Sequence, residues 1–384
     1  MKKLILLLLI LLTSCTATIN GDYSKKEKEF LGYITDSNND MVLLLNTEVY
    51  LTTVNNDLKE QMINTAVSEI TKYHKLLDSY HKYTDEKGNE TINIAILNES
   101  IGKGPIKVDP IIIDALKEAI NLSKLSQGYF NFTIGKLTNL YKDKFLPYDS
   151  INVDPEKNSI KDTLKGIIPI EKIEKYIIID DNANTVEFKK YSSPYLIDLG
   201  AFSKGYIIDK VYNELIKYDT SFLLNAGSSS IVSYTNEKEN INWTISLNNP
   251  ENKNDQLFIF SLNNGAVSTS GDYENYYYLE DGTRRHHILD PFTGYSENYY
   301  NSITLISSNA GIIDALSTAL FNINNQEEFI NIIKNVEKEY NTNISYTYVQ
   351  SGSNIFMDKD FSNTIIKNIP ISNHYTFTTT IIEE

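Results

Sequence analysis

Apolar and polar residues follow two different periods along this chain. From 57 to 83, apolar residues fall three and four positions apart, which predicts a long amphipathic helix. A second helix is expected over 109–128, where an Asp-Pro pair forms a start signal and a glycine forms a stop signal. The stretch 42–54 alternates well enough to predict a first strand.

Strands are expected to dominate the second half of the chain. Two hairpins are predicted, one around Asn182 and Asn184 and one with Asp281 and Gly282 at its tip, because these residues favour tight turns. Further strands are predicted in SFLLNAGSS, NWTISLNNP and FIFSLNNGAVSTSG.

Helices return near the C-terminus. A strand followed by a helix is predicted over 301–323, and another helix over 326–340. The Lys- and Asp-rich stretch 142–175 is typical of a surface excursion, and we find no internal repeat and no convincing linker. The order of elements therefore indicates one α+β domain over 41–384.

Composition narrows the class of protein. Hydrophobic residues make up 41% of the chain and charged residues 22%, as in globular proteins rather than disordered ones. The formal net charge of −15 argues against nucleic acid as a partner, because that affinity depends on Lys and Arg at the phosphates. If the substrate is a phosphate ester, local cations must hold it.

The first residues, MKKLILLLLILLTSC, have the layout of a signal peptide that is too short to span a bilayer stably. Cys15 is the only cysteine, and LTSC resembles a bacterial lipobox, so we expect a lipoprotein signal over 1–15 and lipidation of Cys15. Residues 16–40 would then form a polar tether outside the cytoplasmic membrane, at the periplasmic face or cell surface. A plain secretory signal with a chance cysteine is the alternative. In either case, the mature chain has no disulfide and no thiol catalyst.

The stretch GIIDALSTALF contains a candidate metal site. On a helix, Asp314, Ser317 and Thr318 face one point, since they are three and four positions apart. One carboxylate with two hydroxyls is an all-oxygen set that suits Mg²⁺ and does not suit zinc. The simpler interpretation is a solvated aspartate near a helix start.

The stretch RRHHILDPFTGY pairs two of the five histidines with an acid. A histidine here could act as a base, with Asp290 orienting or capping it. Turn chemistry explains the Asp-Pro-x-Thr-Gly part equally well. The stretches STSG and NAGSSS could bring hydroxyls and bare backbone close to a ligand, and DLGAFSKGY sets an acid, a glycine and a lysine within seven positions. The sequence has no Walker loop, Gly-x-Gly-x-x-Gly string, nucleophile elbow or His-rich zinc motif.

In their order along the chain, these motifs resemble those of the ApbE family, the FAD:protein FMN transferases. The resemblance covers roughly residues 40 to 325 and rests on DLGAFSKGY, NAGSSS, NWTISLNNP, STSGDY, DGTRRHHILDPFTGY and DALSTALF, with LDSYHKY and GYFNFTIGKLTNLY upstream. It implies a T-fold-related domain with antiparallel sheets flanked by helices. The implied reaction cleaves FAD in the presence of Mg²⁺, moves FMN to a threonine hydroxyl of a partner protein and releases AMP.

The resemblance also assigns roles to residues. It implies metal ligands at Asp314, Ser317, Thr318 and the backbone carbonyl of Ala201. His287 matches the active-site histidine, acting as a base or positioning the hydroxyl with Asp290, whereas the neighbouring His286 is not expected to act. The implied flavin-nucleotide contacts are Leu45 (with Thr47), Tyr80, Tyr129, Phe130, Asn131, Asp198, Lys204 and Leu289.

The chain departs from the family at two places. Phe-Asp-Pro-Thr is replaced by Phe130-Asn131-Phe132-Thr133, and Asn-x-Gly-Gly-Asp/Asn is replaced by NAGSSS. Neither change affects the implied metal ligands, but both fall where FAD would bind.

Three functions stay open at this point. The first is the transferase, acting on threonine-bearing proteins of exported flavin electron-transfer complexes. The second is a Mg²⁺-dependent FAD pyrophosphatase, with water in place of the threonine. The third is a flavin-binding lipoprotein without catalysis, which would not need a metal ligand set and a base.

Overall fold

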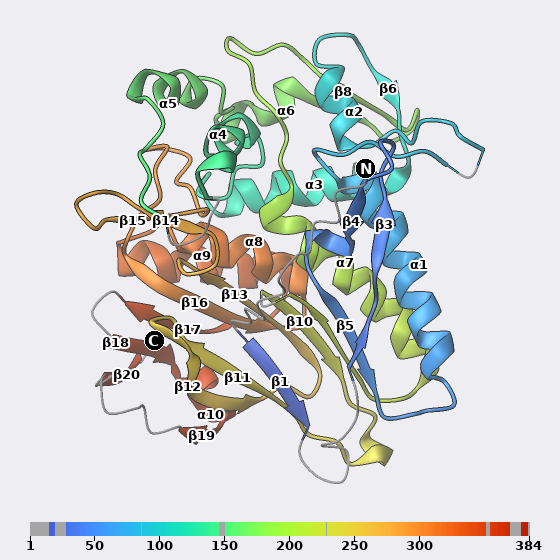
Figure 1. Cartoon of the computed structure of the whole chain (residues 1–384), viewed down its shortest axis with the longest axis vertical. Coiled ribbons are helices and arrows are strands. Elements are labelled where there is room, and N and C mark those ends of the chain that lie inside the picture. The colour runs from blue at the N-terminus through green and yellow to red at the C-terminus, as the bar shows by residue number, and fades with distance from the viewer. Residues whose placement is uncertain are drawn as a thin grey trace, which may run out of the picture.

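The computed structural model describes residues 15–19, 28–85, 87–145, 150–227, 229–350, 354–368 and 378–382. Its centre is a nine-stranded sheet, which Figure 1 shows crossing the middle of the molecule. Its strands, in spatial order, are β2 (Glu29–Phe30), β5 (Val49–Thr53), β9 (Phe222–Ala226), β10 (Ser230–Tyr234), β13 (Gly265–Gly271), β16 (Tyr300–Ser307), β17 (Ser345–Gln350), β18 (Asn354–Asp358) and β20 (Thr378–Ile382). Neighbouring strands are antiparallel except β18 and β20.

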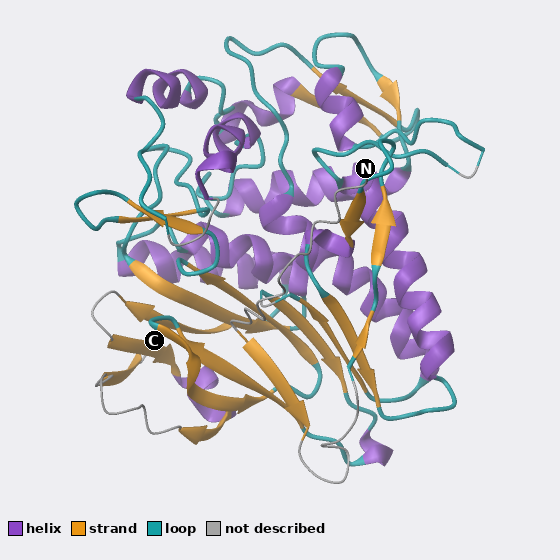
Figure 2. Cartoon of the chain, viewed as in Figure 1, coloured by secondary structure: helices purple, strands orange, loops and turns teal. Residues whose placement is uncertain are grey.

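A four-stranded sheet covers one face of the large sheet (Figure 2). It contains β1 (Cys15–Ile19), β11 (Trp243–Asn249), β12 (Asn252–Ser261) and β19 (Ile365–Asn368). Three small sheets complete the strands: β3 (Tyr33–Thr35) with β4 (Met41–Leu43), β6 (Ile106–Lys107) with β8 (Thr185–Phe188) and β7 (Ile177–Asp180), and β14 (Tyr276–Tyr278) with β15 (Arg284–His286).

Helices cover the other face of the large sheet and build the part of the molecule beyond it (Figure 2). They are α1 (Lys59–Leu77), α2 (Ile94–Glu99), α3 (Pro110–Leu125), α4 (Gly135–Tyr141), α5 (Lys157–Leu164), α6 (Ile173–Tyr176), α7 (Gly200–Leu215), α8 (Ala310–Leu320) and α9 (Gln326–Tyr340). The short α10 (Lys359–Thr364) lies on the side of the four-stranded sheet, where Phe361 packs against Phe258 and Phe260. None of the helices within the described ranges is long and apolar enough to cross a bilayer.

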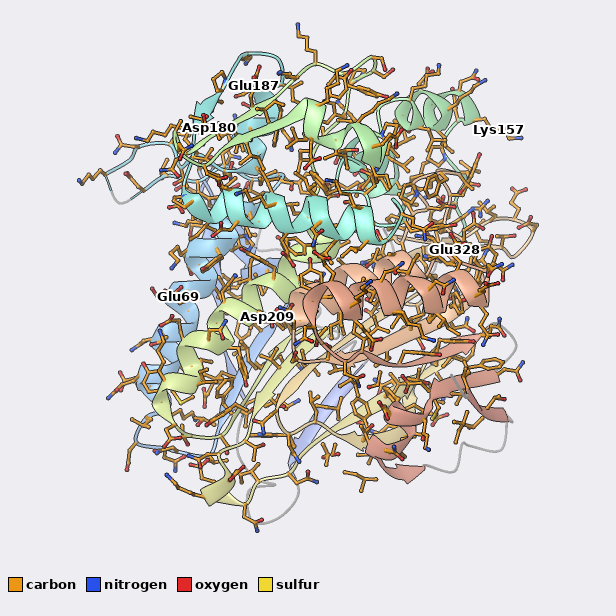
Figure 3. The ribbon with its side chains drawn as sticks, turned by 180° about the vertical axis from the view of Figure 1, so that it is seen from behind. Glu69, Lys157, Asp180, Glu187, Asp209 and Glu328 are labelled. Carbon is orange, nitrogen blue, oxygen red and sulfur yellow. The ribbon has the colours of Figure 1, made fainter. Side chains whose placement is uncertain are left out.

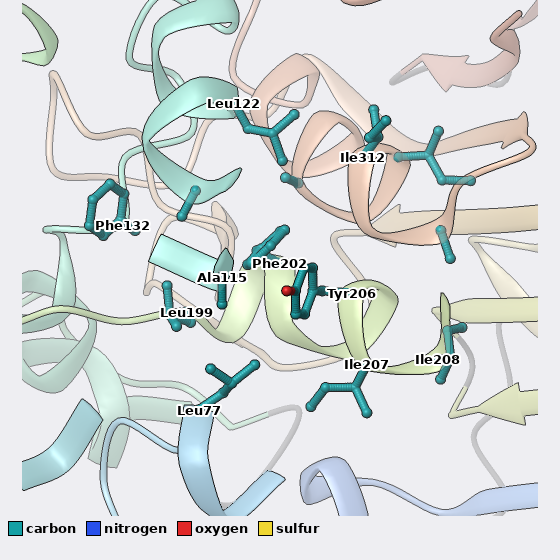
Figure 4. Close-up of a cluster of buried hydrophobic side chains, with 14 of the residues drawn as sticks. Leu77, Ala115, Leu122, Phe132, Leu199, Phe202, Tyr206, Ile207, Ile208 and Ile312 are labelled. Carbon is teal, nitrogen blue, oxygen red and sulfur yellow. The ribbon is translucent and has the colours of Figure 1, made fainter. Parts of the chain in front are cut away.

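Alternation along the strands separates two cores. Leu224 and Val232 point to the helices, whereas their neighbours Leu223 and Ile231 point to the four-stranded sheet. This is the period of two that a strand buried on both faces requires. On the helical side, Figure 4 shows Phe202 of α7 in the centre of a cluster built from several helices. Helices α7 and α8 therefore rest on a fully packed layer of side chains.

The predicted α+β fold with antiparallel sheets flanked by helices is confirmed. The expected helices correspond to α1, α3, α8 and α9, and the expected hairpins to β7–β8 and β14–β15. The single strand predicted over 42–54 is wrong. A turn interrupts it at Leu45, whose φ of 57° is left-handed and whose N–H donates to Nδ1 of His74 over 2.8 Å.

The structure describes only part of the region predicted to hold the signal peptide and the tether. Residues 1–14 of the expected signal lie outside the described part of the chain. Strand β1 begins at Cys15 and pairs with β11, and β2 and β3 also fall in or beside the range expected to be a tether. The division into anchor, tether and domain stays a prediction.

Candidate functional site

The candidate site is built where α7 and α8 cross at close range. Gly205 of α7 makes this possible, since a Cβ there would lie 2.3 Å from the carbonyl oxygen of Ala310 and 2.6 Å from Cβ of Asp314. On α8, a Cβ on Gly311 would lie 3.0 Å from Cα of Tyr206. Two glycines therefore let the two backbones approach and bring Asp314 against α7.

The carboxylate of Asp314 is buried and held from three elements. Its Oδ2 accepts a hydrogen bond of 2.9 Å from the backbone N–H of Gly205. Its Oδ1 accepts longer bonds from the hydroxyls of Ser230 (3.2 Å) and Ser268 (3.3 Å). The ammonium group of Lys204 lies 3.9 Å from Oδ2. The carboxylate is thus fixed in orientation while long, weak bonds leave oxygen lone pairs for a cation.

Hydroxyl groups continue the oxygen surface next to Asp314. Ser317 Oγ lies 2.8 Å from Ser270 Oγ, which in turn lies 3.5 Å from Thr318 Oγ1. In a regular α-helix, the N–H of Gly205 points to the carbonyl of Ala201. Because that N–H donates to Asp314, the Ala201 carbonyl keeps capacity for a further partner.

These residues fit a hard divalent cation. The donors are one carboxylate, hydroxyls and a backbone carbonyl, which are the ligand types of Mg²⁺. A soft or borderline metal has less to bind, since no group of three His, Cys, Asp or Glu side chains forms a metal site in the described ranges. The structure places Asp314, Ser317 and Thr318 on one face of α8 and Asp314 against α7, on which Ala201 lies; their role as metal ligands stays a prediction.

His287 directly follows β15 and lies close enough to Lys204 to feel its charge. His287 is exposed to solvent, and desolvation by the neighbouring chain is the first cause that lowers its pKa, to about 4. The positive charge of Lys204 lowers the pKa further, so the two side chains interact. His287 is therefore neutral at physiological pH and can accept a proton.

The neighbouring His286 has a structural environment. It is fully buried, its Nε2 contacts the carbonyl oxygen of Glu297 over 2.9 Å, and its ring packs edge-on against Phe321. Burial lowers its pKa to about 3. This agrees with the expectation that His286 is not the acting histidine.

Asp290 is used by the turn that follows. Its Oδ1 accepts the N–H of Phe292 over 2.7 Å, and its carbonyl accepts the N–H of Gly294 over 2.8 Å. Burial raises the pKa of its carboxyl group. These contacts favour the capping interpretation of Asp290. The carbonyl of Leu289, the preceding residue, accepts from Nδ2 of Asn322 at the long distance of 3.5 Å, so it retains accepting capacity.

Asp198 and Tyr80 meet at the start of α7. Tyr80 Oη donates to Asp198 Oδ2 over 2.6 Å, and the N–H of Gly200 donates to Oδ1 over 2.9 Å. Burial, with Asp198 second, raises the pKa of Tyr80 well above its usual range, so it is a donor at all physiological pH values. Two of the expected flavin contacts are therefore coupled to each other directly.

The other expected flavin contacts divide into two kinds. Tyr129 is partly exposed and packs edge-on against Phe292, with ring centroids 5.1 Å apart. Phe130 is buried and packs against Phe202 of α7. Asn131 is buried and bonded on both ends: its Nδ2 donates to the carbonyl of Ile168, and its Oδ1 accepts from Thr133. The Asn131 side chain is thus held in place by contacts to the Ile168 and Thr133 segments of the chain. Leu45 likewise spends its N–H on His74.

Several residues of the site escaped the sequence interpretation. Ser230 and Ser268 hold Asp314, and Ser270 extends the hydroxyl surface. STSG and NAGSSS marked the right segments, but nothing in them indicates that their serines converge on one carboxylate. The two arginines before the histidines are also structural, since Arg284 pairs with Asp272 and Arg285 pairs with Asp154.

Comparison with known proteins decides the family. A model of the ApbE family matches residues 45–341, well over half of the chain. The chain belongs to the ApbE family. Proteins named FAD:protein FMN transferase are similar to this ApbE-family chain: one from Klebsiella pneumoniae (strain 342) is 32% identical over 231 residues, and one from Haemophilus influenzae is 29% identical over 220 residues.

The coverage of these similarities differs between sequence and structure. The alignments cover 67% of the Klebsiella protein and 61% of the Haemophilus protein, and 59% and 56% of this chain. The solved structure of an ApbE protein from Thermotoga maritima superposes with a TM-score of 0.69 at 24% identity, covering 89% of this chain and all of that one. A flavin transferase ApbE from Vibrio cholerae gives 0.65 at 19% identity, over 88% of this chain and 99% of its own. The fold is thus that of the ApbE structures.

Proposed function

We propose that this chain is an FAD:protein FMN transferase, which attaches FMN to a threonine of a target protein through a phosphoester bond. The observation that carries the proposal is the buried Asp314 carboxylate on the same face of α8 as Ser317 and Thr318, with Lys204 3.9 Å from it and the neutral His287 near Lys204. The names of its relatives support the same reaction.

The reaction forms one P–O bond and breaks another. The threonine hydroxyl oxygen attacks the phosphorus on the riboflavin side of the FAD pyrophosphate. His287 takes the hydroxyl proton; its lowered pKa keeps the imidazole unprotonated, and so available as an acceptor, at neutral pH. The bond between that phosphorus and the bridging oxygen breaks, and its electron pair leaves with AMP.

Asp314, Ser317, Thr318 and the carbonyl of Ala201 would hold Mg²⁺. When bound, Mg²⁺ supplies positive charge against the pyrophosphate oxygens. Lys204 adds a second positive charge on an otherwise acidic protein and lies close enough to Asp314 to face the same phosphate. Holding the hydroxyl and FAD together supplies the orientation that the displacement needs.

The proposed location rests on the N-terminal sequence. A lipid on Cys15 would anchor the chain outside the cytoplasmic membrane of a bacterium, where threonine-bearing proteins of exported flavin electron-transfer complexes would be its acceptors. Radioactive palmitate labelling of the expressed chain, compared with Cys15→Ser, tests this. Equal labelling of both would contradict the anchor.

The test of the reaction is to incubate the purified chain with FAD and Mg²⁺, with and without a peptide carrying Asp-x-x-Thr-x-Ala-Thr. We expect AMP release and a peptide mass gain equal to FMN less water, both lost in Asp314→Ala. AMP without a mass gain over a panel of acceptors would indicate an FAD pyrophosphatase. FAD that binds and stays intact would indicate a flavin carrier and contradict the proposed mechanism.

A further inference from the structure

A second carboxylate, Asp209, ties α7 to α8 one turn away from Gly205. Its Oδ1 accepts the N–H of Ala310 over 2.8 Å, and its Oδ2 accepts the N–H of Gly311 over 2.7 Å. Figure 3 shows Asp209 from behind, on α7 and below α3. Both oxygens of one side chain are thus spent on the first two N–H groups of the other helix.

Together with Asp314, this makes the contact reciprocal. Asp209 of α7 binds backbone N–H groups of α8, and Asp314 of α8 binds the backbone N–H of Gly205 on α7. In each helix, the carboxylate comes four residues after a backbone contact point, Gly205 before Asp209 and Ala310 before Asp314. The two anchors lie one turn apart along both helices, so they fix translation and rotation of α8 on α7.

The start of α8 depends on α7 for this reason. Its own N-cap, Asn309, satisfies only the N–H of Ile312, over 2.9 Å. The two preceding N–H groups are satisfied by Asp209, and the helix dipole favours an anion at that end. Removing Asp209 would therefore take away the protein acceptor of both N–H groups.

Asp209 does not belong to the surface that would meet the substrate. It lines a cavity of about 560 Å³ on the other side of the helix pair, together with Gly311, Asp114 and Lys117, and neither Lys204 nor Asp314 lines that cavity. Asp209 can therefore act on the site through the position of α8 and through its charge interaction with Asp314.

We propose that Asp209 is a positioning residue for the metal ligand Asp314, holding α8 at the translation and rotation in which Asp314, Ser317 and Thr318 face the substrate. The inference rests on the proposed function for the identity of the metal site. It adds a residue that touches neither metal nor FAD.

The test measures metal binding rather than turnover. Mn²⁺ would be titrated into the full chain with FAD present, and free Mn²⁺ followed by its electron paramagnetic resonance signal. Asp209→Asn keeps one acceptor oxygen and places an amide N–H against the second backbone N–H. We expect its Mn²⁺ affinity to fall about 10- to 100-fold, as for other residues that orient metal ligands. Asp114→Asn, in the same cavity on α3, is the matched control and should bind as the wild type does.

Two further variants keep the result interpretable. Gly311→Ala retains the carboxylate but forces the helices a few tenths of an ångström apart, since its Cβ would lie 3.0 Å from Cα of Tyr206. Gly311→Ala should also weaken Mn²⁺ binding, and this result can be obtained even if Asp209→Asn does not fold. Unchanged affinity in folded Asp209→Asn or in Gly311→Ala would overturn the inference. Unchanged Mn²⁺ affinity in Asp314→Ala would overturn the metal site itself. Whether the wild type releases AMP from FAD tests the reaction separately, so the two failures can be told apart.

Discussion

Tyr80 donates its phenol hydrogen to Asp198 over 2.6 Å, joining the start of the loop after α1 to the start of α7. This bond holds two side chains expected at the flavin nucleotide, which come from parts of the chain 118 residues apart. The other oxygen of the same carboxylate accepts from the N–H of Gly200, and this bond closes the turn after Asp198.

Tyr80→Phe removes that bond and keeps the ring. Since Tyr80 is partly exposed, we expect the free energy of FAD binding to weaken by about 1 kcal/mol, which corresponds to roughly fivefold weaker binding. Flavin fluorescence titration measures it. Tyr50→Phe is the matched control, because Tyr50 donates to Glu48 over 2.8 Å on β5. Equal weakening in both variants would show a general effect of removing a tyrosine hydroxyl.

His287→Ala should lower kcat by roughly 100- to 10,000-fold, the usual contribution of a general base. Because the pKa of His287 is lowered to about 4, its imidazole is neutral above that value. The rate of the wild type should therefore stay level from pH 8 down to about 5 and fall only as pH approaches 4. An acid limb near the ordinary histidine pKa of 6.5 would contradict the assigned environment.

His286 predicts a pH dependence of stability. Its pKa is about 3 in the folded chain and 6.5 when unfolded, so the unfolded chain binds more protons between these values. The free energy of unfolding therefore falls as pH falls below 6.5, by about 2 kcal/mol at pH 5. His286→Gln, which keeps a donor for the carbonyl of Glu297, should remove this part of the slope in urea unfolding.

His81→Gln is the control for that experiment and should act with the opposite sign. The hydrogen bond to Asp78 raises the pKa of His81. Its contribution is present below 6.5 and lost as pH rises through the raised value. If both variants change the slope in the same direction, the assigned burial of His286 is wrong.

Asp154→Asn should loosen the surface excursion over 142–175. Asp154 forms a bidentate pair with Arg285 at 3.0–3.1 Å and also accepts from Tyr277, and both ionic partners are partly buried. We expect about 2 kcal/mol of lost stability and faster tryptic cleavage within the excursion. Asp162→Asn breaks an exposed pair with Lys165 in the same excursion and should change neither.

Asn131→Asp tests the departure from the family pattern. The new oxygen would face the carbonyl of Ile168, where Nδ2 now donates over 3.0 Å. We expect about 2 kcal/mol of lost stability at pH 7, and a smaller loss at pH 5, where a protonated carboxyl can donate. A thermal melt that is unchanged at both pH values would contradict the assigned orientation of the amide.

The sequence predicted those elements whose start and end are set by neighbouring residues. The Asp-Pro start and glycine stop of α3 and the tip of the β14–β15 hairpin are set by neighbouring residues, and they were predicted closely. The turn at Leu45 was missed because its acceptor, His74, lies on a helix 29 positions away.

The same distinction applies to the site. Asp314, Ser317 and Thr318 share one helix face, so their spacing indicated a common site. The hydrogen bonds from Ser230 and Ser268 to Asp314, and from the N–H of Ala310 to Asp209, join chain segments that meet only after folding. No spacing rule in one sequence contains that information.

The β14–β15 hairpin assigns a different contact to each consecutive residue, from Arg284 at Asp272 to His287 at Lys204. Its tip, by contrast, is exposed at Asp281 and Gly282, and nothing lies within 4 Å of the position a Cβ on Gly282 would take. A short insertion at the tip would leave the register of β14 with β15 intact, whereas one inserted residue beyond Arg284 would turn the histidines over. The tip is therefore where a fluorophore could be attached to report on acceptor docking, at a known number of residues from the reacting centre.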